Sequence, residues 1–177
     1  MTGIIRTATA LDAGALAGLA AVTFPLACPP GSSPEDIAAH VRDTLSAEKF
    51  AQYLADPDIT ILVIDCGGGL QGYSMLVHRP AQDPEVAAAL TLLPSAELSK
   101  CYVHPEYHGL GTAARLMAGT LEQAATRGAA GMWLGVNSEN AKAIRFYEKS
   151  GFRKVGTKSF RLGTTLEHDF VMELGLR

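Results

Sequence analysis

The order of helical and strand patterns predicts an α/β domain with a mixed, mostly antiparallel sheet. Both kinds of pattern occur in each half of the 177 residues, which argues against the all-α and all-β classes. Two apolar runs, 59–64 and 70–77, are separated by a triple glycine, which is typical of a hairpin. Two further strands close the chain. We therefore expect a single domain over residues 1–177, with about seven strands flanked by helices rather than a doubly wound parallel sheet.

Helix start signals organise the first half of the chain. Thr9 and Asp12 form an acidic capping box, and Ser33 precedes proline and two acids, which is a strong helix start. Ser46 can cap a third helix, which ends before Pro57. The predicted elements are a strand at 4–8, helices ending near 23, 45 and 55, and the two hairpin strands.

The second half alternates between the two periodicities. Residues 79–95 carry three prolines around a small apolar turn, which predicts a loop. The elements expected after it are a strand at 96–103, a helix at 111–127, a strand at 132–136, a helix at 140–150 and strands near 152–160 and 167–174.

Composition narrows the class of protein. Hydrophobic residues make up 47% and charged residues 19%, with net charge −3, as in ordinary soluble domains, so neither nucleic acid nor a membrane is an expected partner. Three separated cysteines indicate neither a disulfide framework nor a metal site, which favours a reducing, cytoplasmic compartment. Residues 13–34 carry no charge, but their glycines and prolines should interrupt a membrane-spanning helix or signal sequence.

Residues 104–115 have the composition of a pyrophosphate-binding loop. Gly109 and Gly111 lie between a predicted strand and a predicted helix, where backbone N–H groups and the helix dipole favour an anion. The segment also matches the G-x-G-x-x-G/A dinucleotide pattern. Its glycines come five residues after the strand, and no acid ends the next strand, so a dinucleotide-binding fold is not expected.

A second motif spans residues 133–152. Asn140 is a good N-cap, and Ala143, Ile144 and Tyr147 share one face of the helix that follows it. Together, the two segments resemble the acyl-CoA core of the GNAT superfamily of N-acetyltransferases. His108-x-x-Gly111-x-Ala113 is similar to its phosphate loop, and the residues from Asn140 to Phe152 are similar to its N-x-x-A-x-x-(F/L)-Y-x-K-x-G-F signature.

The resemblance implies acetyl-CoA as cosubstrate, no metal, and a core over about residues 96–155. Within the superfamily, residues 96–177 look like the PaiA-type spermidine/spermine N-acetyltransferases, on short segments such as Trp133-Leu134-Gly135-Val136 and Asp169-Phe170-Val171-Met172. The cofactor-binding residues that it implies are Cys101, Val103, His108, Gly109, Leu110, Gly111, Thr112, Ala113, Asn140, Ala143, Phe146, Tyr147 and Lys149.

The resemblance also suggests catalytic roles. Tyr147 would be the general acid, since a phenol of pKa about 10 is protonated at neutral pH. Glu97 would be the general base, and backbone groups from Cys101 to Val103 would bind pantetheine and polarise the thioester. Each side chain has a plainer alternative: a buried aromatic for Tyr147, a solvated carboxylate for Glu97 and a small core residue for Cys101.

His108 stands where the superfamily has Gln or Arg, and Leu110 where Arg or Lys is frequent. The pyrophosphate should therefore depend on backbone N–H groups, with Arg115 or Lys149 as sources of positive charge. His108 is expected to be a phosphate neighbour or an ordinary loop histidine.

Charge separates the two halves of the sequence. Residues 1–99 have net charge −7 and residues 100–177 have +4, which would attract a cationic amine to the first half and anionic coenzyme A to the second. Solvated helices alone would give the same acidic half. We expect acetyl transfer to a primary amine, above all a polyamine. The alternatives are acetylation of a peptide N-terminus and a non-catalytic CoA-binding module. Pairing through the last two strands would give a homodimer.

Overall fold

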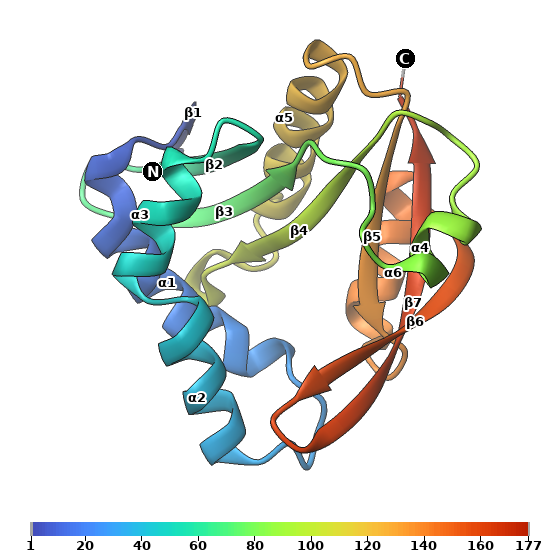
Figure 1. The fold of residues 1–177 in the computed structure, drawn as a ribbon. Coiled ribbons are helices and arrows are strands. Elements are labelled where there is room, and N and C mark those ends of the chain that lie inside the picture. Colours follow the sequence, from blue (N-terminus) through green and yellow to red (C-terminus); the bar gives the residue numbers. More distant parts are fainter. Residues whose placement is uncertain (1, 177) are drawn as a thin grey trace.

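The computed structural model describes residues 2–176, apart from the side chain of residue 160. Seven strands form one sheet in the order β1-β2-β3-β4-β5-β7-β6 (Figure 1). The strands are β1 (Ile4–Thr7), β2 (Ile59–Asp65), β3 (Leu70–Val77), β4 (Ser95–Val103), β5 (Gly131–Asn137), β6 (Arg153–Leu162) and β7 (Thr165–Gly175). The β4–β5 pair is parallel and the other five pairs are antiparallel. The predicted α/β class with a mixed, mostly antiparallel sheet is confirmed.

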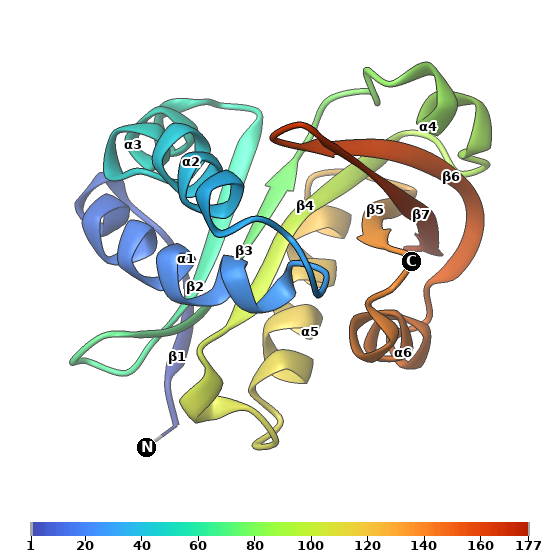
Figure 2. The same ribbon diagram turned by 90° about the horizontal axis from the view of Figure 1, so that it is seen from below.

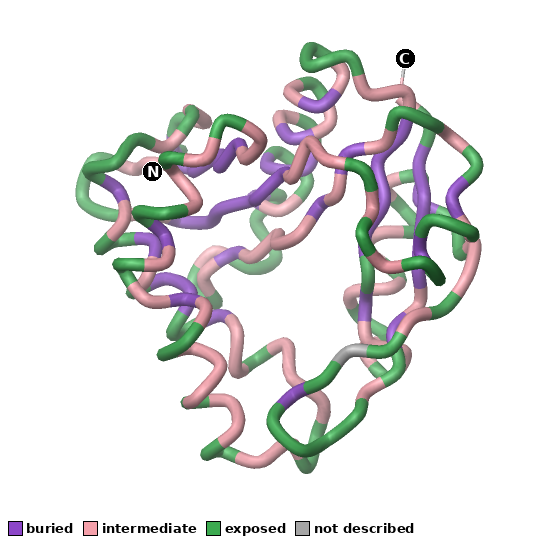
Figure 3. Tube along the Cα trace, in the orientation of Figure 1, coloured by how far each residue is buried: buried purple, intermediate pink, exposed green. Residues whose placement is uncertain are grey.

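Helices cover both faces of the sheet. They are α1 (Ala13–Ala27), α2 (Pro34–Thr44), α3 (Ala47–Ala55), α4 (Pro84–Ala89), α5 (Thr112–Thr126) and α6 (Ala141–Ser150), with short 3-10 turns at Ala10–Asp12 and Pro105–Tyr107. Helices α1 and α3 pack on one face of β2 and β3, while α5 and α6 pack with the other face of the sheet. Figure 3 shows the buried segments concentrated along the strands between these layers.

The predicted helix caps lie where the sequence placed them. Ser33 Oγ accepts a hydrogen bond from the Asp36 N–H at 3.4 Å, and Ser46 Oγ accepts one from the Lys49 N–H at 3.2 Å. The Thr9–Asp12 capping box is also present, with the Thr9 N–H donating to Asp12 Oδ2 at 2.7 Å. Local polar chemistry therefore sets these helix starts.

Helix α1 is longer than predicted, because it runs past Thr23 to Ala27 and includes Pro25. Leu16, Leu19 and Ala20 are buried against the sheet, and this packing outweighs the low helix propensity of the glycines and the one backbone donor that proline lacks. By length and composition alone, residues 10–27 could also cross a membrane. The expected helix end near residue 23 is therefore wrong, whereas the expected interruption within residues 13–34 occurs at Cys28, just before Pro29 and Pro30.

Strands β4 and β5 pair only at their beginnings and then separate. Their parallel register joins Ser95, Ala96 and Glu97 to residues 131–133, although β4 continues to Val103 and β5 to Asn137. Seen from below in Figure 2, the two strands diverge, and the β6–β7 hairpin reaches across toward α2. The divergence leaves the backbone of the second half of β4 without a strand partner on its β5 side.

Candidate active site

A cavity of about 710 Å³ opens where β4 and β5 separate. Its walls come from both layers of helices and from the β6–β7 hairpin. On the α5–α6 side they include Tyr107, His108, Gly109, Gly111, Thr112, Ala113, Ala114, Asn140, Lys142, Ala143, Phe146 and Tyr147. On the α1–α2 side they include residues 23–29 in part, His40, Glu97, Lys100, Lys158, Glu167 and Asp169. One cavity therefore collects residues from distant parts of the sequence.

The loop before α5 presents uncapped backbone donors to this cavity. Gly109 and Gly111 have φ of 76° and 77°, a left-handed conformation that favours glycine. Gly111 is the N-cap of α5 and has no side chain to satisfy the first N–H groups of the helix. These N–H groups and the positive end of the helix dipole fit an anionic pyrophosphate, as the sequence predicts.

Along β4, the backbone N–H and C=O groups of successive residues face alternately toward β3 and toward the gap on the β5 side. The His104 N–H donates to the Gln71 carbonyl at 2.8 Å, so the backbone of Tyr102 also faces β3, while Cys101 and Val103 face the gap. His108 Nε2 donates to the Val103 carbonyl at 2.7 Å. The polar backbone groups of Cys101 and the Val103 N–H can therefore bind an extended ligand chain that lies in the gap. The hydrogen bond to the Val103 carbonyl directs the imidazole of His108 to the C-terminal end of β4.

Tyr147 reaches the cavity from α6, whose start is fixed by Asn140 Oδ1 accepting from the Ala143 N–H at 3.1 Å. The phenol ring lies 5.5 Å from the Phe146 ring and 5.8 Å from the Phe152 ring, between centroids. Burial raises the pKa of Tyr147 well above its usual value of 10, and Cys101 and Tyr102 act in the same direction. The hydroxyl is thus a proton donor throughout the neutral range.

Glu97 reaches the cavity from the opposite face of the sheet. Its neighbours Ala96 and Leu98 pack in the core beside α5, so the side chain between them points to the α1–α3 side. Burial raises the pKa of Glu97, while Lys158 and Lys100 oppose that shift. A carboxylate with a raised pKa is suited to accept a proton near neutral pH.

Cys101 is a poor nucleophile in this environment. Burial raises the pKa of its thiol to about 12, which keeps it in the thiol form at neutral pH. Its side chain packs with the apolar clusters on the α5 side of the sheet. This agrees with the core role that the sequence suggested, and an acyl-cysteine route receives no support.

Twelve of the fourteen residues predicted for the site line the cavity, and Leu110 and Lys149 do not. The side chain of Leu110 is 69% exposed. Lys149 follows Tyr147 by two residues, about 200° around the helix, and is exposed. Arg115 donates to the Gly3 carbonyl at 2.7 Å. The predicted sources of positive charge are therefore directed elsewhere, and Lys142 on the first turn of α6 lines the cavity instead.

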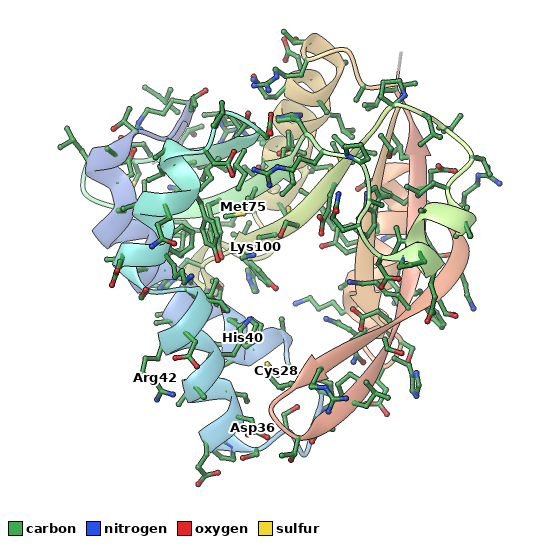
Figure 4. All side chains as sticks on the ribbon, in the orientation of Figure 1. Cys28, Asp36, His40, Arg42, Met75 and Lys100 are labelled. Atoms are coloured by element: carbon green, nitrogen blue, oxygen red, sulfur yellow. The ribbon has the colours of Figure 1, made fainter. Side chains whose placement is uncertain are left out.

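Sequence reasoning missed most of the α1–α2 side of the cavity. Lys100, Lys158, Glu167 and Asp169 come from three strands, and His40 comes from α2 (Figure 4). Asp169 belongs to a segment that carried the PaiA-type resemblance, but no sequence pattern assigned any of these residues a role in the site. The alternation of β6 and β7 could have suggested that Lys158 and Asp169 share a face, but only the register pairs them.

Comparison with known proteins agrees with this geometry. The family model described as the acetyltransferase (GNAT) family matches residues 27–152. An uncharacterized N-acetyltransferase of Mycobacterium tuberculosis is 48% identical over 161 residues, which cover 91% of this chain and 96% of that protein. The chain belongs to the GNAT family. It is therefore an acyltransferase with acetyl-CoA as cosubstrate.

Two further comparisons concern a curated relative whose name states its acceptor and a solved structure with coenzyme A bound. A [ribosomal protein bS18]-alanine N-acetyltransferase of Salmonella typhimurium is 30% identical over 111 residues, covering 61% of this chain and 75% of that protein. A PaiA N-acetyltransferase from Thermoplasma acidophilum, solved in complex with coenzyme A, has a TM-score of 0.77 over 99% of both chains at 23% identity. The PaiA structure supports the fold, and the name of the Salmonella protein states a ribosomal-protein alanine as the acceptor of that protein.

Proposed function

We propose that this GNAT enzyme acetylates a small primary amine, with Tyr147 as general acid and Glu97 as general base. One observation carries the proposal: the two side chains approach the same cavity from opposite faces of the sheet, and Glu97 is the last residue of β4 that pairs with β5 before the strands separate. A base on one side of a reacting carbonyl and an acid on the other is the arrangement that amide formation needs.

Acetyl-CoA supplies the acetyl group as a thioester, and the products are the acetylated amine and the free thiol of coenzyme A. The loop at Gly109–Gly111 and the first N–H groups of α5 hold the pyrophosphate, with Lys142 nearby. The free backbone groups of Cys101 and Val103 hold the pantetheine chain along β4. Asn140 starts the helix that carries Ala143, Phe146 and Tyr147 along this wall.

The catalytic residues then move two protons. Glu97 takes one from the incoming ammonium, which at neutral pH is protonated because an alkyl amine has a pKa near 10.4. A backbone N–H of β4 polarises the thioester carbonyl. The Tyr147 hydroxyl gives a proton to the sulfur as the C–S bond breaks, and its phenolate takes the second proton that the nitrogen loses when the amide forms. Because the pKa of Glu97 is raised, activity should increase as pH rises through that pKa, and Glu97→Gln should abolish this limb of the profile.

Two kinds of acceptor have support. The charge pattern of the sequence predicts a polyamine. Three carboxylates, those of Glu97, Glu167 and Asp169, line the α1–α2 side of the cavity, which we take as the acceptor side. A peptide N-terminus is the second candidate, because relatives 30% and 34% identical are named as ribosomal-protein alanine N-acetyltransferases.

The three cysteines are all free, which supports a reducing, cytoplasmic location.

The test is thiol release from acetyl-CoA with spermidine, spermine, free lysine and a mixed peptide pool, each against a control without acceptor. Tyr147→Phe should lower kcat at least tenfold and leave the affinity for coenzyme A within about threefold. Tyr73→Phe is the matched control: Tyr73 lies outside the cavity, and its buried hydroxyl has no hydrogen-bond partner in the described structure. If both variants keep wild-type kcat, Tyr147 is not the acid. If no acceptor is turned over while coenzyme A binds, the protein is a CoA-binding module.

A further inference from the structure

Two lysines on the acceptor side of the cavity make no close ion pair with a described residue, although Glu97 and Asp169 interact with them at longer range. Lys100 Nζ donates to Ser99 Oγ at 3.2 Å and lies 5.7 Å from the centre of the Tyr53 ring. Lys158 Nζ lies 5.9 Å from the centre of the Trp133 ring. Among the described residues, neither ammonium lies within 4.0 Å of a carboxylate oxygen.

A bulge in β4 brings Lys100 to this face. Met75 pairs with Lys100 and Leu76 with Leu98, so Ser99 is an extra residue in the strand. Without the extra residue, Glu97 and Lys100 would point to opposite faces of the sheet, because side chains an odd number of positions apart in a strand lie on opposite faces. With it, both face the acceptor side, and Figure 4 shows Lys100, His40 and Cys28 along the same opening.

A glycine in β5 allows Lys158 to reach the cavity. A Cβ on Gly135 would lie 2.5 Å from Lys158 Cε and 3.4 Å from its Nζ, so the lysine side chain lies directly over the bare backbone of the strand. Any larger residue would push it aside. Lys158 also pairs across the strands with Asp169, whose Oδ2 would lie 3.4 Å from the same Cβ.

Each of these ammonium groups has more N–H donors than there are acceptors bonded to it among the described residues. Each ammonium carries three N–H donors, yet Lys100 makes one hydrogen bond, to Ser99, and Lys158 makes none with a described residue. Holding an ammonium in a partly buried cavity is unfavourable unless an anion or water compensates it. Burial lowers the pKa of Lys100 even though Glu97 opposes the shift, and an anion bound at the ammonium would oppose it further.

We propose that Lys100 and Lys158 form a subsite for an anionic group, a carboxylate or phosphate, carried by the acceptor amine. The inference rests on the proposed function, since it concerns the acceptor of the same reaction. The amine binds at Glu97, and the anionic group extends between the two ammonium groups. Glu97, Glu167 and Asp169 line the same side of the cavity and suit any amine, but a polyamine has no group that could bind the two lysines. A negative charge would therefore distinguish the acceptor of this subsite from spermidine.

The experiment compares amines that differ only in the anionic group. β-Alanine, 4-aminobutanoate and 6-aminohexanoate are each assayed against the matching amide, with 2-aminoethyl phosphate against ethanolamine and with spermidine as the polycation. Thiol release is measured at saturating acetyl-CoA. We expect kcat/KM for at least one anionic amine to exceed that of its neutral partner by tenfold or more. A preference for the phosphate or for a carboxylate identifies the group.

Three variants assign that preference to the lysines. Lys100→Met and Lys158→Met should each reduce the ratio of anionic to neutral kcat/KM at least fivefold, and Lys100→Arg should retain most of the ratio because it keeps the charge. Lys49→Met, on α3 outside the cavity, is the control and should keep the wild-type ratio. Circular dichroism spectra report whether each variant folds. Should Lys100→Met not fold, the Lys158→Met and Lys100→Arg ratios decide.

The outcomes separate this inference from the proposed function. Turnover of spermidine or of the neutral amides with no preference for the anionic members overturns the subsite and leaves the amine acetyltransferase intact. An equal fall of both rates in Lys100→Met and Lys158→Met also overturns it, since the lysines then act on the amine or on folding. Absence of turnover with every amine overturns both proposals.

Discussion

Replacing Asp12 by Asn should lower the free energy of unfolding by about 2 kcal/mol at pH 7. Asp12 is 8% exposed and accepts two hydrogen bonds of 2.9 Å from the Arg6 guanidinium, which also bonds to Asp65. The hydrogen bonds from Arg6 lower the pKa of Asp12 from 3.8 to about 2, against the opposing effect of burial. At about 1.36 kcal/mol per pH unit, this difference is worth about 2.4 kcal/mol.

The sign of the pH dependence follows from the lowered pKa. The folded state binds the proton of Asp12 less tightly than the unfolded state, so the stabilisation is complete above about pH 5 and is lost as pH falls through 2. At pH 3, about half of it should remain. The gap between wild type and Asp12→Asn should therefore shrink on acidification.

Urea unfolding, followed by the fluorescence of the single tryptophan, buried Trp133, measures this gap at pH 7 and pH 3. Asp43→Asn is the matched control, because Asp43 pairs with Arg42 at a site where both side chains are more than 60% exposed. Its effect should stay below about 0.5 kcal/mol. Equal stability of the two variants, or an Asp12→Asn deficit that is undiminished at pH 3, would refute the role given to the Arg6–Asp12 pair.

Three further predictions concern the site and the assembly. Gly111→Ala should raise the KM for acetyl-CoA several-fold, because it strains a left-handed residue of the proposed phosphate loop. Gly67→Ala is the control: it strains a left-handed residue with φ 86° in the β2–β3 turn and should leave that KM unchanged in steady-state kinetics. Gly135→Ala should raise the KM for the acceptor more than that for acetyl-CoA, because it displaces Lys158; equal changes in both KM values would contradict this. Strand β6 forms one edge of the sheet, so pairing through it would give a dimer, and a light-scattering mass of one chain would exclude that assembly.

The sequence predicted most residues of the proposed cofactor half of the site, because the features that bring them to the cavity are local. The glycines at 109 and 111 and the cap at Asn140 act through backbone conformation and hydrogen bonds within a few residues. Tyr147 follows Asn140 by seven residues, so helical periodicity alone places both on one face. Short-range geometry of this kind is nearly independent of the rest of the fold, and the helix starts at Ser33 and Ser46 were predicted for the same reason.

Periodicity failed where packing outweighed propensity. Helix α1 continues through Pro25 because its apolar side is buried against the sheet, and that burial is invisible in the local sequence. Lys149 matched a motif position, but the helix directs it away from the cavity. A motif match identifies a residue type at a spacing and leaves its surroundings undetermined.

The acceptor side was decided by the tertiary structure alone. Strand alternation places Glu97 and Lys100 on opposite faces, and only the bulge at Ser99 brings them together. Lys158 reaches the cavity because β6 pairs with β7, β7 with β5, and Gly135 leaves room for its side chain. Sheet register and strand order are set by burial summed over the whole domain. A sequence pattern can therefore indicate the cofactor, while the charges that we propose for the acceptor are brought together only in the folded sheet.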